Sequence, residues 1–312
     1  MIRNLFVRMA CWMVAVTLML LTTAAIAQSP ATVEPVIVAN KGIGGQTSER
    51  ALKRFESDVL SLEPDHLVIY LGTNDALNAG HLVLLEDYRQ NMTTMIRQAR
   101  EAGVQRIVLV TLHPVIADIA IRRHPTHPQA DRINEHIAEY DAALRHIAEQ
   151  EKTGLVDMRA IVQAHGGAEA TKNSLIRNPE NEGGSDGVHF TAEGYRLLGE
   201  AIAEQFNDVI KPGQLVACCG DSLTFGPAVE GAGTSFGQTY PAVLNNKLNK
   251  MVGAEPDARA FGPASQTPRG NNLLVNGDFE DTVDGRLPYH WLLWSRPGMY
   301  EGRLRRIVDD DA

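Results

Sequence analysis

Ser222 lies in a sequence context that suits a nucleophile. It comes shortly after the apolar run Leu215–Cys219, at the point where a parallel strand would end and ligands usually bind. Its flanks do not form the Gly-x-Ser-x-Gly pattern, so we do not expect the strained nucleophile elbow of α/β-hydrolases. A serine hydroxyl here could attack an acyl carbon if a base lay beside it. The alternative role for Ser222 is to cap the start of a helix.

Asp186 and His189 form the second candidate group. They are three residues apart in a glycine-rich loop that precedes the predicted helix 192–209. At this spacing the carboxylate can accept a hydrogen bond from the far ring nitrogen of the histidine, which fixes its tautomer and stabilises the imidazolium. His189 would then be a general base. The alternative is an ordinary surface pair in a flexible loop, but Thr191 and Gly194 are typical of a helix start and define where the loop ends.

Two further residues have the properties that a developing oxyanion requires. Asn74 follows the apolar run His66–Leu71 and can donate an uncharged N–H, although it could equally hold an Asx turn. Gly45 allows a close backbone approach that a side chain would obstruct. We expect the neighbouring Gly72, Asp75 and Asp221 to shape loops rather than to react.

These residues belong to four short strings that resemble the catalytic blocks of the SGNH (GDSL-type) esterase and lipase family. The strings are Cys219-Gly-Asp-Ser-Leu-Thr224, Asn40-Lys-Gly-Ile-Gly-Gly-Gln-Thr47, Leu71-Gly-Thr-Asn-Asp75 and Ser185-Asp-Gly-Val-His189. The resemblance implies a serine hydrolase with Ser222 as nucleophile, His189 as base and Asp186 as its partner. It also assigns the oxyanion hole to the backbone N–H groups of Ser222 and Gly45 and to the side-chain amide of Asn74.

The remaining histidines are not expected to carry chemistry. His113, His124, His127 and His165 fall in predicted loops and lack the cysteine or carboxylate pattern of a metal site. We therefore expect no metal and no cofactor. His113 follows a strand end at the same predicted sheet edge, so it could line a substrate pocket.

The rest of the chain predicts the elements that would position this site. Short apolar runs alternate with amphipathic stretches from residue 35 onward, which indicates a parallel sheet with helices on both faces. The resemblance implies a flavodoxin-like three-layer α/β/α fold. The predicted strands are Pro35–Ala39, His66–Leu71, Arg106–Leu112, Gly154–Met158 and Leu215–Cys219, and the predicted helices are 48–62, 84–102, 131–151, 192–209 and 240–251.

The order of the four blocks indicates a circular permutation. In the family the Gly-Asp-Ser block normally comes first, whereas here it comes last. The predicted helix 192–209 runs through Lys211-Pro212-Gly213 into the Gly-Asp-Ser strand, as if the old chain ends had been joined. Because the ends of compact domains often lie close together, such a rearrangement is tolerable. We predict that Leu215–Cys219 lies between Pro35–Ala39 and His66–Leu71.

The C-terminal region divides into two further segments. Residues 256–270 form a linker in which Ala260–Thr267 resembles a degraded copy of Asn40–Thr47, with Ser265 at the place of Gly45, although a chance match in a Gly/Pro-rich linker is an equal explanation. Residues 271–312 resemble the opening of a β-sandwich carbohydrate-binding module, but the chain ends too soon for a sandwich of roughly 100 residues. The segment would then be a truncated remnant or part of a longer sequence, and the alternative is an exposed aromatic tail. We expect the hydrolase domain to span 33–255 and residues 256–312 to be peripheral.

Residues 1–27 resemble a cleavable secretory signal. Arg3 and Arg8 precede an apolar run from Met9 to Ile26, and Ala25-Ile26-Ala27 is a small-x-small cleavage site. The alternative is an uncleaved anchor helix. We expect a secreted or periplasmic protein with no stable membrane association after cleavage.

The net charge limits the classes of binding partner, and the cysteine content argues against a structural disulfide. Removal of residues 1–27 takes away two arginines and no acid, so the formal charge moves from −9 to −11. This acidity argues against nucleic acid or an anionic membrane as a partner. Of the three cysteines, Cys11 leaves with the signal, and the adjacent Cys218 and Cys219 are poorly placed to bridge each other.

We therefore expect a secreted serine esterase that releases a short acyl group, acetyl in particular, from a small-molecule or polysaccharide ester. A lipase, lysophospholipase or thioesterase is the second interpretation, but the stretch 114–130 is polar and contains no apolar lid. A third is a non-catalytic glycan-binding protein on a hydrolase scaffold. Retention of Ser222, Asp186, His189, Asn74 and Gly45 together argues against this third possibility. The oligomeric state is left open.

Overall fold

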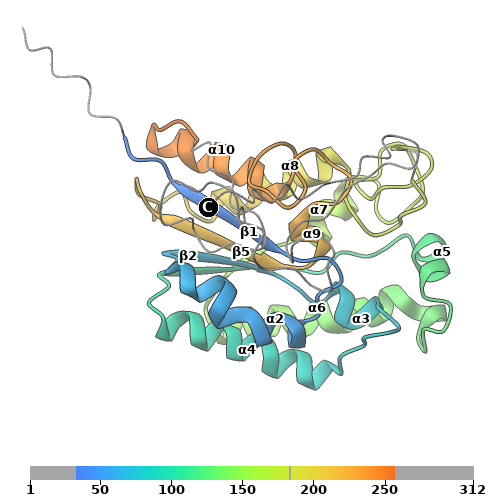
Figure 1. Cartoon of the computed structure of the whole chain (residues 1–312). Helices are drawn as coiled ribbons and strands as arrows, with labels where there is room; N and C mark the ends of the chain where they lie inside the picture. Colours follow the sequence, from blue (N-terminus) through green and yellow to red (C-terminus); the bar gives the residue numbers. More distant parts are fainter. Residues whose placement is uncertain (1–32, 183, 257–312) are drawn as a thin grey trace, which may run out of the picture.

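Five strands form one parallel sheet in the computed structural model, which describes residues 33–182 and 184–256. The order across the sheet is β1-β5-β2-β3-β4, so the last strand in sequence lies between the first two (Figure 1). The predicted place of Leu215–Cys219 is therefore confirmed. The strands are β1 Ile37–Gly42, β2 His66–Tyr70, β3 Arg106–Val110, β4 Gly154–Val156 and β5 Leu215–Gly220.

The spatial order is the flavodoxin-like one if the chain is followed from β5. In that case the strands are met in the order 2-1-3-4-5, which is a common doubly wound arrangement. Parallel pairing of β5 with both β1 and β2 maintains this order. The predicted three-layer α/β/α class is thus confirmed.

Helices cover both faces of the sheet, which explains why the strands are apolar on both sides (Figure 1). Alternate strand residues enter two separate cores, with Cys219 in one and Cys218 in the other, so the two thiols are buried on opposite faces and do not pair. One face carries α2 Ser48–Arg54, α4 Leu85–Glu101 and α6 Ile133–Gln150, and the other carries α7 Met158–Ala164, α8 Ala192–Glu204 and α10 Tyr240–Val252.

The structure moves several predicted boundaries. β1 starts and ends later than predicted, because Asn40 and Lys41 stay in the ladder with β5 despite their polarity. The Asn40 amide is buried, and its Nδ2 donates to the carbonyl oxygens of Thr224 and Thr234 at 3.0 Å each, which offsets the cost of burying a polar group. The predicted helix 48–62 divides into α2, a π-helical turn over Phe55–Val59 and a 3-10 turn over Leu60–Leu62.

Several short helical elements were not predicted. They are α3 Thr73–Leu77, α5 Ala117–Ala120, α9 Ser222–Phe225, the 3-10 turn Ile121–Arg123, and α7, whose first residue, Met158, was predicted to end a strand. The predicted helix 131–151 begins with the 3-10 turn Ala130–Arg132. In the part of the chain that the structure describes, no helix is long and apolar enough to cross a bilayer. The predicted signal 1–27 lies outside the described residues, as do residues 257–270 of the predicted linker and the whole carbohydrate-binding-module-like segment 271–312.

Candidate active site

Three neighbouring strands end at one level and bring three of the predicted site residues to the same edge. Gly42 of β1 pairs with Gly220 of β5, which in turn pairs with Tyr70 of β2. Gly45 and Ser222 follow these strand ends within a few residues, and Asn74 lies in α3 directly after β2. Because all three strands are parallel, the loops after them leave on the same side of the sheet.

Ser222 is the first residue of α9. Its predecessor Asp221 is the N-cap, and Asp221 Oδ1 accepts a hydrogen bond from the N–H of Leu223 at 2.8 Å. The alternative role for Ser222 as the helix cap is therefore wrong. The Ser222 hydroxyl does not cap the helix, and the residue is partly exposed at the sheet edge.

Glycine at the strand ends lets α9 lie directly on β1 and β5. A Cβ atom at Gly42 would lie 2.2 Å from the backbone nitrogen of Phe225, and one at Gly220 would lie 2.0 Å from Thr224 Oγ1. Both separations are too short for any side chain. These two glycines therefore determine how closely Ser222 approaches the strand ends.

A continuous line of hydrogen bonds joins Ser222, His189 and Asp186. His189 Nε2 lies 2.8 Å from Ser222 Oγ, and His189 Nδ1 lies 2.9 Å from both carboxylate oxygens of Asp186. Asp186 Oδ1 also accepts from the backbone N–H groups of Val188, at 3.1 Å, and His189, at 3.0 Å. The structure thus brings together all three residues that the sequence placed in a triad.

The charge of Asp186 is stabilised within the loop. Burial alone would raise the pKa of this carboxyl, but the hydrogen bonds and charge of His189 outweigh burial and hold its pKa well below the usual range. Arg123, which is about half exposed, adds a distant ion pair at 3.5 Å. Asp186 is therefore ionised across the neutral range and suited to orient an imidazole.

The loop that carries Asp186 and His189 is held by its backbone. The N–H of Arg177 donates to the carbonyl of His189 at 2.8 Å, and the N–H of Ile116 donates to Gly187 at 2.9 Å. Thr191 then caps α8 by accepting from the N–H of Gly194 at 3.2 Å, as its sequence position predicted. The base is thus fixed by ordered backbone on both sides.

Asn74 and Gly45 have the features expected of oxyanion donors. Both are partly exposed, as is Ser222. Gly45 has φ +73°, and a Cβ there would meet no atom within 4 Å, so its glycine reflects backbone conformation and not crowding by the protein. The amide nitrogen of Asn74 donates to Asp221 Oδ2 at 3.0 Å.

His113 does not line a pocket. It is fully buried, with Nδ1 2.8 Å from the hydroxyl of Tyr70 and Nε2 2.9 Å from the carbonyl oxygen of Val188. The prediction that His113 lines a substrate pocket is therefore wrong, because its side chain is buried in the core beneath the loop that carries His189. Within residues 33–182 and 184–256, no three histidine, cysteine or acidic residues gather as metal ligands would.

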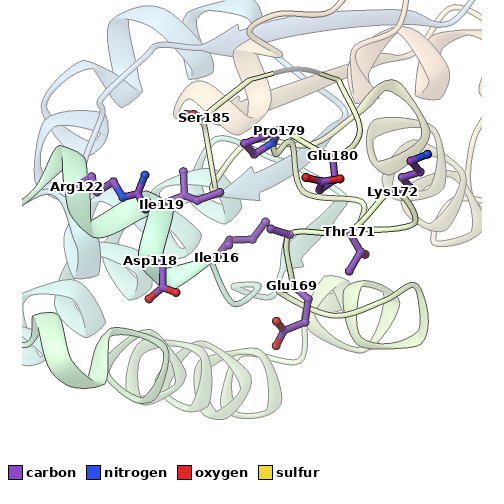
Figure 2. A pocket seen from close by; sticks show the side chains of 11 residues that line it. Ile116, Asp118, Ile119, Arg122, Glu169, Thr171, Lys172, Pro179, Glu180 and Ser185 are labelled. Atoms are coloured by element: carbon purple, nitrogen blue, oxygen red, sulfur yellow. The ribbon is translucent and has the colours of Figure 1, made fainter.

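A hollow of about 610 Å³ lies beside the loop that carries Asp186 (Figure 2). Its wall comes from Ile116, from α5 and the 3-10 turn after it, and from the chain between α7 and α8, which includes Ser185. Neither His189 nor Ser222 is among the residues that line it. The wall contains five charged side chains, Asp118, Arg122, Glu169, Lys172 and Glu180, and the two isoleucines Ile116 and Ile119.

Arg54 supports the site in a way that the sequence did not reveal. Its guanidinium donates to the carbonyl oxygens of Lys41, at 2.8 Å, and Gly220, at 3.3 Å, and to Gln46 Oε1 at 3.2 Å. It therefore ties the ends of β1 and β5 to the residue after Gly45. In the sequence it is only one of several cations on an amphipathic helix, so no signal distinguished it.

A parallel α/β sheet whose C-terminal edge joins a serine, a histidine and an aspartate has the arrangement of a serine hydrolase. The chain belongs to the GDSL-like lipase/acylhydrolase family, whose model matches residues 22–197. Members of this family are serine hydrolases that act on ester bonds. The matched segment contains Gly45, Asn74, Asp186 and His189, whereas Ser222 lies beyond its end.

Two named proteins are similar in sequence. The uncharacterized lipoprotein YqeF of Bacillus subtilis is 30% identical over 179 residues, which cover 54% of this chain and 72% of that protein. The isoamyl acetate-hydrolyzing esterase of Saccharomyces cerevisiae is 27% identical over 175 residues, covering 53% of this chain and 66% of the esterase. Among solved structures, a lipase/acylhydrolase from Enterococcus faecalis is 26% identical, covers 55% of this chain and 75% of its own, and has a TM-score of 0.42.

Proposed function

We propose that this chain hydrolyses short-chain acyl esters, acetyl esters of carbohydrates in particular, with Ser222 as nucleophile, His189 as general base and Asp186 as the group that orients the base. The observation that carries this proposal is the unbroken contact from Ser222 Oγ through His189 to Asp186. The family to which the chain belongs supplies independent support.

The chemistry follows from these contacts. His189 Nε2 accepts the proton of Ser222 as its oxygen attacks the ester carbonyl, and Asp186 stabilises the resulting imidazolium. The imidazolium then returns the proton to the departing alcohol, which leaves an acyl group on Ser222. A water molecule, deprotonated by the same histidine, releases the acid and restores the serine.

The negative oxygen formed in each step needs donors that are already in place. We assign this role to the backbone N–H groups of Ser222 and Gly45 and to the amide N–H of Asn74. Their support is the common sheet edge from which all three project and the unusual backbone of Gly45. Donors of this kind each contribute on the order of 10² to 10³ in rate.

We also propose that the domain is a circular permutant of the family fold. Two observations support this history. The sheet has the flavodoxin-like order only when it is followed from β5, and the family model ends before the Gly-Asp-Ser block. The connection 205–214 between α8 and β5 would then be the junction of the former ends.

The acetyl specificity is supported by the yeast relative, whose name describes hydrolysis of isoamyl acetate. The carbohydrate part rests on the resemblance of residues 271–312 to a binding module and on the predicted signal at 1–27. The name of the Bacillus relative, a lipoprotein, is consistent with a place outside the cytoplasm. We therefore propose export, and a small-molecule or polysaccharide ester as the substrate.

Turnover of p-nitrophenyl acetate by the wild type and by Ser222→Ala tests the activity. We expect Ser222→Ala to lose at least roughly 10³-fold in kcat, as for other serine triads. Ser57→Ala, which changes an exposed serine away from the site, is the matched control and should behave as the wild type. Equal turnover by Ser222→Ala and the wild type would rule out the proposed nucleophile.

Two further measurements distinguish an acetylesterase from a glycan-binding protein and from a lipase. A wild type that binds acetylated oligosaccharide but turns over no ester would be a glycan-binding protein. A series of p-nitrophenyl esters from acetate to decanoate distinguishes an acetylesterase, whose kcat/KM should fall with chain length, from a lipase, whose kcat/KM should rise.

A further inference from the structure

Asp221 is a buried carboxyl that the catalytic steps above do not use. It is 1% exposed and lies between the end of β5 and the start of α9. Its two oxygens have different partners: Oδ1 accepts from the N–H of Leu223 at 2.8 Å, and Oδ2 accepts from the side-chain amide of Asn74 at 3.0 Å. One carboxylate thus joins the helix that begins with Ser222 to α3, which carries Asn74.

We propose that Asp221 is a positioning residue that fixes the orientation of the Asn74 amide, so that its second N–H and not its carbonyl oxygen is available to the oxyanion. This inference rests on the proposed function, in which Asn74 is an oxyanion donor.

The argument depends on the difference between the two ends of an amide. An asparagine side chain has an NH₂ group with two donors at one end and an oxygen acceptor at the other, of nearly the same shape. A half turn about its last torsion would point a lone pair at the oxyanion and repel it. An ionised carboxylate only accepts hydrogen bonds, so it holds the NH₂ end of Asn74 toward itself and leaves the second N–H in a defined direction.

The hydrogen-bond donors to the Asp221 side chain, the Asn74 amide and the N–H of Leu223, are neutral, and in the described part of the chain Asp221 forms no ion pair within 4.0 Å. The charge of Asp75 of α3 raises the pKa of Asp221. The charge of Asp221 in turn raises the pKa of four buried groups around it, namely Tyr70 of β2, Cys219 of β5, Tyr88 of α4 and Tyr195 of α8. Burial, together with the charge of Asp75, raises the pKa of Asp221 to about 7. Above about pH 7 the Asp221 carboxyl is therefore ionised and only accepts hydrogen bonds, which strengthens its preference for the NH₂ end of the Asn74 amide.

Asp221→Asn is the informative change, because an asparagine retains an oxygen for the N–H of Leu223 and places an NH₂ group opposite Asn74. The Asn74 amide must then turn to present its oxygen. Removal of a buried charge should leave the fold intact at pH 8. Asp75→Asn is the matched control: Asp75 is also a buried aspartate, in the same helix as Asn74, but it accepts from Ser48 and not from Asn74.

We expect Asp221→Asn to lower kcat for p-nitrophenyl acetate by about 10- to 100-fold at pH 8, with KM within about threefold. Asp75→Asn should retain kcat within about threefold. In the double variant Asp221→Asn/Asn74→Ala, kcat should equal that of Asn74→Ala within about twofold, because the amide is already absent. Losses that multiply, or a kcat for Asp221→Asn equal to the wild type, would overturn the proposal.

A readout without turnover separates this proposal from the proposed function. In Ser222→Ala protein, the side-chain NH₂ signal of Asn74, identified by its loss in Asn74→Ala, should shift with pH around a midpoint near 7 by ¹⁵N NMR. Asp221→Asn should abolish that shift. If the wild type proves to have no esterase activity but the shift is present and depends on Asp221, the positioning contact stands and the proposed function fails. If the signal does not respond to Asp221, the positioning role fails, whatever the activity.

Discussion

The Nε2 atom of His113 lies 2.9 Å from the carbonyl oxygen of Val188, the residue immediately before the candidate base. A carbonyl only accepts, so Nε2 carries the proton and Nδ1 accepts from the hydroxyl of Tyr70. The ring also packs on Phe190, with centroids 4.4 Å apart. His113 thus connects the core strand β2 to both neighbours of His189.

This connection predicts a measurable effect of His113→Phe. The phenyl ring fills a similar space but leaves the hydroxyl of Tyr70 and the carbonyl of Val188 buried without their partner, which should cost about 1–3 kcal/mol in the free energy of unfolding. The His189 loop should also loosen, so kcat should fall while KM changes little. Urea unfolding and turnover of p-nitrophenyl acetate measure both. The control is His146→Phe on the exposed side of α6, and equal kcat for the two variants would contradict the prediction.

Two buried groups should give opposite slopes to the pH dependence of stability. Burial lowers the pKa of His113 to about 4, so the unfolded chain binds its proton first as pH falls from about 6.5, and this group destabilises the fold between about 6.5 and 4 by up to about 3 kcal/mol. The pKa of Asp221 is raised to about 7, so this carboxyl destabilises the fold as pH rises from about 4 to 7.

The expected outcome is a difference between variants. From pH 4 to 6.5, the free energy of unfolding of Asp221→Asn should rise more steeply with pH than that of the wild type, whereas His113→Phe should rise less steeply or fall. Urea titrations at half-unit steps of pH measure these slopes. Parallel curves for all three proteins would show that neither group has the perturbed pKa described above.

The candidate site residues and the strands of this domain could be predicted from the sequence because short local patterns mark them. Four short strings identified the five candidate residues: Gly-Asp-Ser, Gly-Thr-Asn-Asp, Asp-Gly-Val-His and the glycine-containing string Asn40–Thr47. Hydrophobic periodicity identified all five strands to within a few residues. The place of β5 followed from the requirement that Ser222 meet Gly45 and Asn74.

What could not be predicted depends on contacts between distant segments. Arg54 and His113 are ordinary residues in sequence, and only the fold brings them to strand ends and loops more than 70 residues away. The buried polarity of Asn40 was likewise hidden, because its partners, Thr224 and Thr234, come almost 200 residues later. Four-residue helices such as α9 give too short a pattern for periodicity to detect.

Arg54→Met should lower activity by loosening the strand ends that support Gly45 and Ser222. Methionine keeps the length of the side chain but removes the donors to Lys41, Gly220 and Gln46, so the ends of β1 and β5 lose a shared anchor next to Gly45. We expect kcat to fall by roughly tenfold or more, and the free energy of unfolding to fall by about 1–3 kcal/mol. Arg50→Met, an exposed position in the same helix, is the control. Equal kcat values for Arg54→Met and Arg50→Met would show that Arg54 does not support the site.

The adjacent pair Gly44 and Gly45 offers the sharpest test of the oxyanion assignment. A Cβ at either position would meet no atom within 4 Å, so an alanine fits both spaces equally well. Only Gly45 has a left-handed backbone, with φ +73°, and an alanine there costs roughly 1 kcal/mol or turns the peptide to a new orientation. Either response moves the N–H that we assign to the oxyanion.

Gly45→Ala should therefore lower kcat by about 10- to 100-fold with a small change in KM, and Gly44→Ala should remain close to the wild type. The larger Gly45→Val should be worse, since a branched side chain tolerates a positive φ less well. Steady-state turnover of p-nitrophenyl acetate at saturating substrate compares the three variants directly. Ser265, which takes the place of Gly45 in the degraded copy and lies outside the described residues, gives the opposing test. Full activity in Gly45→Val, together with loss of activity in Ser265→Val, would mean that the later string and not Asn40–Thr47 supplies the donor.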